Sequence, residues 1–155
     1  MKHNAQTIRS RLWSLASLAG LKVAPTEIDV EICRAPHKPP SALPPDKIAV
    51  YIFFQKAQCL KVGKVGLNSN ARYIGQHYSP GSSNSNLAKS ILESPDRIGI
   101  STVDSENVGE WIKTNTDRIN VLFPVAWGIP FLTLAEAFLQ FWLRPVVYEG
   151  FESQR

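Results

Sequence analysis

Two apolar segments follow each other so closely in this chain that a β-hairpin is the structure expected for both. Residues 47–54 are rich in Val, Ile, Tyr and Phe, which is typical of a buried strand, and residues 58–65 form a second apolar segment. Only Gln55-Lys56-Ala57 lies between them, a loop short enough to join antiparallel strands. Tyr51 and Lys61 could then project onto the same face of this hairpin.

A helix that carries basic residues is predicted directly after the hairpin. Asn68 or Ser69 can cap its N-terminus, and Arg72 and His77 follow along it, five positions apart. Residues at this spacing do not share a face of a regular helix. An extra residue at Gly75 could form a π-bulge that turns His77 back to the face of Arg72.

A second helix is predicted over residues 132–143, between Pro130 and Pro145. Its surface is apolar except for one narrow stripe of polar residues. The stripe consists of Thr133, Glu136, Gln140 and Arg144. A helix face in water usually carries more Lys and Glu than this, so we expect the stripe to line a groove.

The chain divides by pattern into an N-terminal extension, residues 1–46, and a core, residues 47–155. The extension is predicted to contain an amphipathic helix (6–19), a strand with one acidic and one apolar face that suits a sheet edge (27–32), and a proline-rich arm (36–45). The core is further predicted to contain a short strand (97–103), a helix (108–115) and a third core strand (119–127).

Charge is distributed unevenly along the chain. Residues 47–92 carry six Lys and Arg side chains and no carboxylate, within a chain of net charge +4. A nucleic acid is a polyanion that Lys and Arg attract and that carboxylates repel unless they hold a metal. We therefore predict nucleic-acid contacts in this region, at Lys64, Asn68 and Lys89.

The hairpin contains two tripeptides, Ala49-Val50-Tyr51 and Lys61-Val62-Gly63. Lys61 follows Tyr51 by ten residues. This pairing resembles the two signature tripeptides of the GIY-YIG nucleases. Arg72 and Glu136 match the Arg and the helical Glu of that family in order and spacing, and Pro145 matches the proline after the Glu helix. The resemblance covers roughly residues 47 to 148 and is closest to restriction-endonuclease-like members.

The chain also departs from the family pattern. Ala49 replaces the first Gly, and Lys61 replaces the Tyr of the second tripeptide. His77 comes five residues after Arg72, where the family often has a His or Tyr one helical turn after the Arg. The Asn that usually follows the proline is absent from residues 146–149.

The resemblance implies an α+β fold, with a core of a three-stranded antiparallel sheet flanked by helices, and a Mg²⁺-dependent endonuclease acting on DNA. Tyr51 would be the general base, helped by Lys61, or Lys61 would itself be the base. Arg72 and His77 would stabilise the charge of the transition state, and Glu136 would bind Mg²⁺ or Mn²⁺. A single carboxylate binds Mg²⁺ weakly, so metal and nucleic acid should bind together.

Two other functions stay open at this point. The altered second tripeptide and the missing Asn are compatible with a GIY-YIG-like nucleic-acid-binding module without turnover. The proline-rich arm is compatible with a protein-interaction domain. Other chemistries fit poorly: Val65 stands where a phosphate-binding loop needs Ser or Thr after Gly63-Lys64, and the cysteines and histidines form no zinc motif.

Location and assembly are predicted from composition. Two cysteines and the absence of an apolar signal pattern favour a reducing cytoplasm. The apolar region 123–147 is interrupted by Pro124, Pro130, Glu136 and Arg144, so we expect a core element instead of a membrane span. The partners expected are DNA and, as one option, a second copy of the chain in a homodimer.

Overall fold

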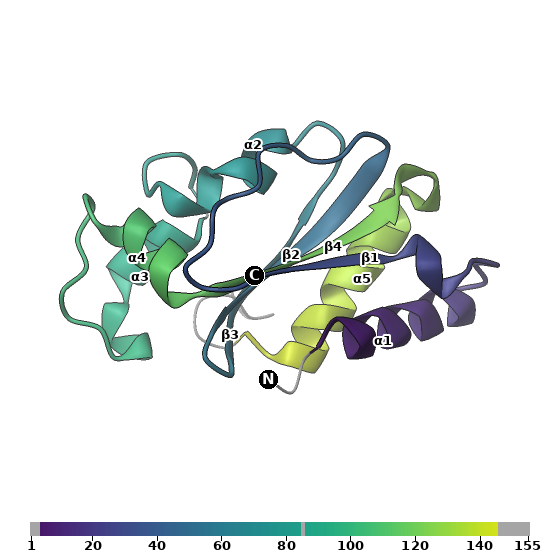
Figure 1. Ribbon diagram of the computed structural model, residues 1–155, viewed down its shortest axis with the longest axis horizontal. Helices are drawn as coiled ribbons and strands as arrows, with labels where there is room; N and C mark the ends of the chain where they lie inside the picture. The colour runs from purple at the N-terminus through teal and green to yellow at the C-terminus, as the bar shows by residue number, and fades with distance from the viewer. Residues whose placement is uncertain (1–3, 85, 146–155) are drawn as a thin grey trace.

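The computed structural model describes residues 4–84 and 86–145, which form one antiparallel sheet with helices on both faces (Figure 1). The strands are β1 (Asp29–Cys33), β2 (Lys47–Gln55), β3 (Gln58–Val65) and β4 (Asp117–Pro124), and their order across the sheet is β1-β4-β2-β3. The hairpin of β2 and β3 is therefore confirmed, and so is the α+β class.

The expected number of strands was wrong, because the described chain contains four strands and not three. The fourth is β1, which belongs to the N-terminal extension and pairs with β4 from Asp29 opposite Leu122 to Cys33 opposite Arg118. β4 also pairs with β2, so β4 lies inside the sheet, between β1 and β2. The predicted edge strand is thus part of the core sheet.

Three helices, α2 (Asn70–Ile74), α3 (Leu87–Glu93) and α4 (Val108–Asn115), cover one face of the sheet. Two more, α1 (Ala5–Leu18) and α5 (Gly128–Leu143), cover the other face, below the sheet in Figure 1. Side chains along a strand alternate between faces. Ile48, Val50 and Ile52 accordingly pack against α1 and α5, whereas Tyr51 and Phe53 pack against the opposite helices.

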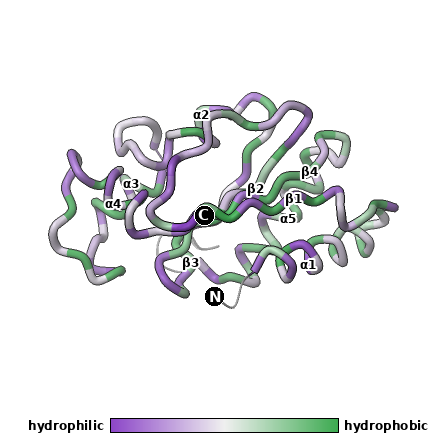
Figure 2. The backbone as a smooth tube through the Cα atoms, in the orientation of Figure 1, coloured by the Kyte–Doolittle hydropathy of each residue, from purple (hydrophilic) through white to green (hydrophobic). Residues whose placement is uncertain are grey.

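The two long helices follow their sequence signals closely. Asn4 caps α1, with its side chain accepting a hydrogen bond from the backbone N–H of Thr7 at 2.8 Å. α5 begins at Gly128, four residues before the predicted start, because Pro130 is tolerated in the first turn of a helix. Figure 2 shows hydrophobic residues along the sheet and α5, and a mixture of hydrophobic and hydrophilic residues along α1.

Two expectations for the second half of the chain need correction. No strand forms over residues 97–103; instead a short 3-10 turn spans Pro95–Ile98, and Gly99 follows with φ +70°. A proline at the start and a left-handed glycine at the end favour a turn over an extended strand. The expected strand 119–127 begins at Asp117 and ends at Pro124, where a 3-10 turn, Val125–Trp127, leads into α5.

The segment Val125–Leu143 is long and apolar enough, by length and composition, to cross a membrane. In the structure, five of its apolar side chains are buried in the core: Trp127, Phe131, Leu132, Ala135 and Leu139. The exposed face of α5 carries Leu134 and Phe141.

Candidate active site

Tyr51 and Lys61 lie on the same face of the sheet, as the hairpin register requires. Tyr51 stands opposite Gly63, and Phe53 stands opposite Lys61. Directly opposite residues of antiparallel strands point to the same side. Both side chains are buried, Tyr51 with 3% and Lys61 with 3% of its surface exposed. The sheet face under α2 therefore carries a phenol and an ammonium group close together.

The absence of a side chain at Gly63 allows the Tyr51 ring to lie against the β3 backbone. A Cβ atom at position 63 would overlap the Tyr51 hydroxyl and the ring carbon that bears it, so the ring lies directly over the Gly63 backbone. Glycine inside a strand often marks such a close approach. Since β3 is the end strand in the sheet order, the Tyr51 hydroxyl is carried out toward that edge.

We expect the Gly63→Ala variant to lose about 1–3 kcal/mol of unfolding free energy, because the added methyl group must push the Tyr51 ring aside. Urea denaturation measures this loss. Gly81→Ala is the matched control, since a Cβ there meets no atom within 4 Å. Equal midpoints for Gly63→Ala and the control would contradict the close contact.

His77 packs against Tyr51 from the helical side. The two ring centroids are 4.4 Å apart, and His77 is 1% exposed. Its Nδ1 accepts a hydrogen bond from the backbone N–H of Leu87 at 3.3 Å, so the proton of the neutral ring is on Nε2. That Nε2 has no hydrogen-bond partner among the described residues. His77 thus presents a buried donor beside the phenol.

The electrostatic setting of His77 keeps its ring neutral. Burial, together with the positive charges of Lys61, Arg118 and Arg72, lowers the pKa of His77 to about 2. A protonated His77 would add a fourth cation to a desolvated cluster. His77 is therefore neutral near pH 7, with its proton on Nε2, and does not act as an acid.

The neutral state of His77 predicts a pH effect on stability. In the unfolded chain His77 binds a proton below about pH 6.5, while in the folded chain it stays neutral down to about pH 2. The contribution of His77 to the free energy of unfolding is therefore fully present above pH 6.5. Below that pH it decreases by about 1 kcal/mol per pH unit. Urea denaturation at pH 7 and pH 5 should show a smaller loss for His77→Gln than for the wild type, and equal losses would contradict this assignment.

The path of the chain around His77 differs from the expected helix. α2 ends at Ile74 with Gly75 as its C-cap, and a 3-10 turn over Gln76–Tyr78 follows. The predicted π-bulge is thus wrong, because the break at Gly75 ends the helix instead. Arg72 stays exposed on α2, while the turn carries His77 into the core.

Arg118 of β4 is a fully buried arginine that the sequence analysis did not select. Its Nε donates to Asn120 Oδ1 at 2.8 Å, one terminal nitrogen donates to the Tyr73 carbonyl at 2.6 Å, and the other donates to the Tyr78 hydroxyl at 3.3 Å. Arg118 and Asn120, two positions apart in an apolar strand, are the signal that could have revealed it.

Hydrogen bonds extend this network in two directions. His37, from the proline-rich arm, donates from Nδ1 to the Thr116 carbonyl and accepts the Tyr78 hydroxyl proton at Nε2, both at 2.8 Å. On the other side, Glu31 Oε2 of β1 accepts from Asn120 at 3.3 Å and from the Tyr73 hydroxyl at 3.4 Å. Burial, followed by the charge of Glu31, raises the pKa of Tyr73. The N-terminal extension therefore contributes His37 and Glu31 to the hydrogen-bond network around Arg118.

Glu136 reaches β3 from the opposite face of the sheet. Its Oε2 lies 2.6 Å from Lys64 Nζ, and its side chain is 15% exposed. Lys64 stands opposite Val50, which packs against α5. Tyr51 and Glu136 therefore lie on different faces, but they reach the adjacent residues Gly63 and Lys64 of the same strand.

The metal-binding capacity of this arrangement is limited to Glu136. Within residues 4–84 and 86–145, no three His, Cys, Asp or Glu side chains gather in a way that could hold a metal ion. One carboxylate suits Mg²⁺ only when phosphate oxygens and waters complete the shell. The Lys64 ammonium, which is partly exposed, would also have to move from Glu136. Glu136 fits a metal that arrives together with a nucleic acid.

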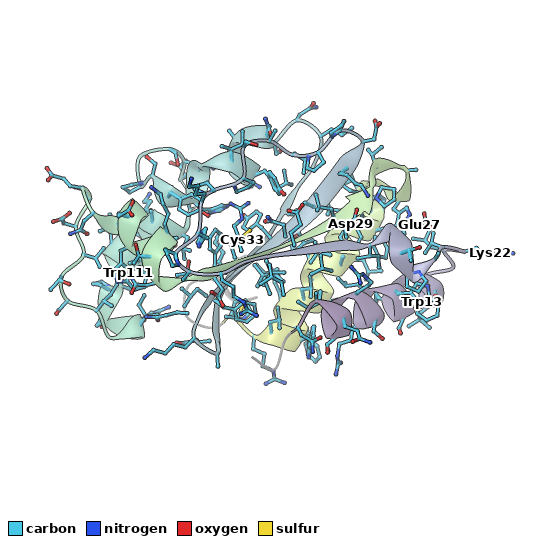
Figure 3. All side chains as sticks on the ribbon, viewed as in Figure 1. Trp13, Lys22, Glu27, Asp29, Cys33 and Trp111 are labelled. Atoms are coloured by element: carbon cyan, nitrogen blue, oxygen red, sulfur yellow. The ribbon has the colours of Figure 1, made fainter. Side chains whose placement is uncertain are left out.

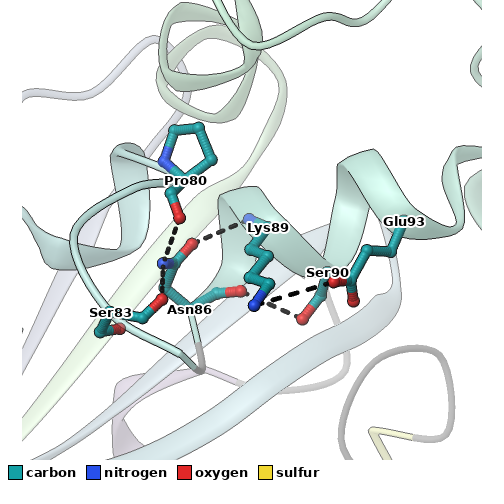
Figure 4. A network of polar contacts seen from close by, with 6 residues as sticks. All are labelled: Pro80, Ser83, Asn86, Lys89, Ser90 and Glu93. Atoms are coloured by element: carbon teal, nitrogen blue, oxygen red, sulfur yellow. Dashed lines mark hydrogen bonds and ion pairs between the residues drawn. The ribbon is translucent and has the colours of Figure 1, made fainter.

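The remaining predicted contacts lie at different places. Asn68 is exposed in the turn after β3, and Lys64 is the ion-pair partner of Glu136. Lys89 lies on α3, where its Nζ is 3.9 Å from Glu93 (Figure 4). Asn86 closes the preceding polar loop, donating to the carbonyls of Pro80 and Ser83 and accepting from the Lys89 backbone. The structure thus brings together Tyr51, Lys61, Arg72 and His77, and leaves Lys89 on a separate helix.

Comparison with known proteins identifies no relative of this chain: no family model, no curated protein and no solved structure matches it.

Proposed function

We propose that this protein is a Mg²⁺-dependent endonuclease that hydrolyses DNA phosphodiester bonds by GIY-YIG-type chemistry. The proposal rests on two contacts with adjacent residues of β3. The Tyr51 ring lies over Gly63 on one face of the sheet, and Glu136 forms an ion pair with Lys64 on the other face. A water attacking phosphorus needs a proton acceptor, and the leaving 3′ oxygen needs charge neutralisation on the opposite side. Groups arriving at β3 from two faces suit these two tasks.

The basic residues supply the charge that a phosphate requires. Arg72 is exposed on α2, and a guanidinium can bind two phosphate oxygens at once. His77 is buried against Tyr51, so in this proposal it positions the phenol ring. Tyr51 or Lys61 would take the proton from the attacking water as the bond to the leaving 3′ oxygen breaks. Mg²⁺, when bound by Glu136 and the phosphate, would neutralise that oxygen.

Two observations favour the alternative, a nucleic-acid-binding module without turnover. The Tyr51 side chain is almost completely buried, and the Glu136 carboxylate is already paired with Lys64. Both groups would have to become accessible before a phosphate could react. In that case Arg72 and Lys64 alone would bind DNA.

Cleavage of supercoiled, linear double-stranded and single-stranded DNA, with Mg²⁺ and with EDTA, tests the proposal. We expect the wild type to cut in Mg²⁺ only, and Tyr51→Phe to bind DNA but cut at least about 100-fold more slowly, because the ring stays and the hydroxyl is lost. Tyr73→Phe is the control, since it removes the hydroxyl of another buried tyrosine on the same sheet face. Salt-dependent binding without cutting of any substrate would favour the binding module.

A further inference from the structure

A hollow of about 350 Å³ lies where the end of β3 meets the start of α5. It is lined by residues 66–69 from the turn after β3, by Val125, and by Gly128 and Ile129 from the first turn of α5. Two of its apolar side chains are unusually exposed, Leu67 at 56% and Ile129 at 53%. Exposed apolar side chains gathered at a concave site indicate a ligand with an apolar face.

The same hollow has a polar side. Asn68 makes no hydrogen bond with any residue that the structure describes, although its amide can donate and accept. Ser69 is the N-cap of α2, but its side chain makes no capping hydrogen bond. A ligand with an apolar face and a hydrogen-bonding edge would use both kinds of lining.

The hollow lies near the proposed active site along both β3 and α5. Gly66 follows Lys64 by two residues along the strand, which is about 7 Å. Ile129 precedes Glu136 by seven residues along α5, which is about 10 Å. A DNA strand that places a phosphate at Lys64 and Glu136 therefore passes the hollow within a few nucleotides.

We propose that this hollow receives one unstacked nucleobase of the DNA strand that is held at Lys64 and Glu136, an inference that rests on the proposed function. Leu67 and Ile129 would contact the faces of the base, and Asn68 would hydrogen-bond its edge. Arg72 is exposed and follows the lining segment in sequence, and Lys64 precedes it and becomes available to a phosphate when its ion pair with Glu136 opens. These two charges favour a polyanion over an apolar peptide. The preferred substrate is then DNA with an unpaired nucleotide next to the cleavage position, because such a base costs less to unstack than a paired one.

The test uses the full chain with Ca²⁺ in place of Mg²⁺, so that a metal can bind at Glu136, and a DNA duplex with a single bulged 2-aminopurine, a base whose fluorescence rises when it leaves the stack. We expect the protein to brighten this probe and to bind it about tenfold more tightly than the fully paired duplex. Ser69→Phe, which fills the hollow, should lose both effects while still binding the paired duplex. Asn68→Ala, which removes the amide that would read the base edge, should also lose both effects. Ser101→Phe, at an exposed position outside the hollow, is the control for an added aromatic ring.

The outcomes separate this inference from the proposed function. Equal brightening and equal preference for the bulge in the wild type and Ser69→Phe would overturn the base pocket, even if DNA is cleaved in Mg²⁺. Brightening that depends on Asn68 and Ser69, in a protein that cuts no DNA, would support the pocket and reject the nuclease. Circular dichroism of Ser69→Phe and the smaller change in Asn68→Ala distinguish a filled pocket from a misfolded chain.

Discussion

Replacing Glu136 by Gln is expected to reduce Mg²⁺-dependent DNA cleavage on the order of 10³-fold, which corresponds to about 4 kcal/mol of transition-state stabilisation. Gln keeps the shape of the side chain but loses the negative charge that would bind the metal. The Lys64 ion pair is lost as well, yet Lys64 remains free to contact a phosphate, so DNA binding should be kept. Cleavage rates at saturating DNA, together with a binding measurement in EDTA, separate the two effects.

Glu110→Gln is the matched control for this variant. Glu110 is also a helical carboxylate in an ion pair, with Lys113 Nζ at 3.1 Å, but it is exposed on α4. Breaking a pair at the surface costs little. Full cleavage by Glu110→Gln and by Glu136→Gln alike would reject Glu136 as the metal ligand. Loss of DNA binding in Glu136→Gln alone would indicate a structural role instead.

Replacing Arg118 by Met is expected to lower the free energy of unfolding by about 3–5 kcal/mol. Met fills a similar volume but offers none of the hydrogen bonds that Arg118 donates to Asn120, Tyr73 and Tyr78. Each buried acceptor left without a donor keeps its desolvation cost. Urea denaturation near neutral pH measures the loss.

Lys22→Met is the control for Arg118→Met, because it removes the same charge at an exposed site. Lys22 projects from the far end of the molecule, beyond the C-terminal end of α1 (Figure 3). Its replacement should change the stability by no more than about 0.5 kcal/mol. A loss below about 1 kcal/mol for Arg118→Met would mean that the network does not hold the core together.

The Arg118 network links the stability of the sheet to the candidate active site. Arg118 contributes to the low pKa of His77, and its guanidinium carbon is 5.9 Å from the centre of the Tyr51 ring. The extension contributes Glu31 and His37 to the same network. A truncation that removes the extension would therefore disturb the proposed site as well as the sheet.

Local pattern was sufficient to predict several elements. The hairpin of β2 and β3 followed from two apolar segments and a three-residue loop, and α1 followed from its apolar spacing. The edge position of β1 was also anticipated from its alternation. These features depend on residues close together in the chain, and their spacing is visible in the sequence.

Other features were decided by packing between residues far apart in the chain. Asn120 and Glu31 are 89 positions apart, and nothing in their local sequence indicates that they share a hydrogen bond. The pairing of β1 with β4, which makes the sheet four-stranded and places Glu31 opposite Asn120, is also a contact between distant parts of the chain.

The candidate site divides in the same way between sequence and tertiary structure. The sequence by itself determined which chemical groups are present and in what order: Tyr51, Lys61, Arg72 and Glu136. Only the tertiary structure decided that His77 is buried against Tyr51 and that Glu136 approaches β3 from the other face. The physical reason is that strand register and helix docking set the face and depth of each side chain, and these depend on the whole core.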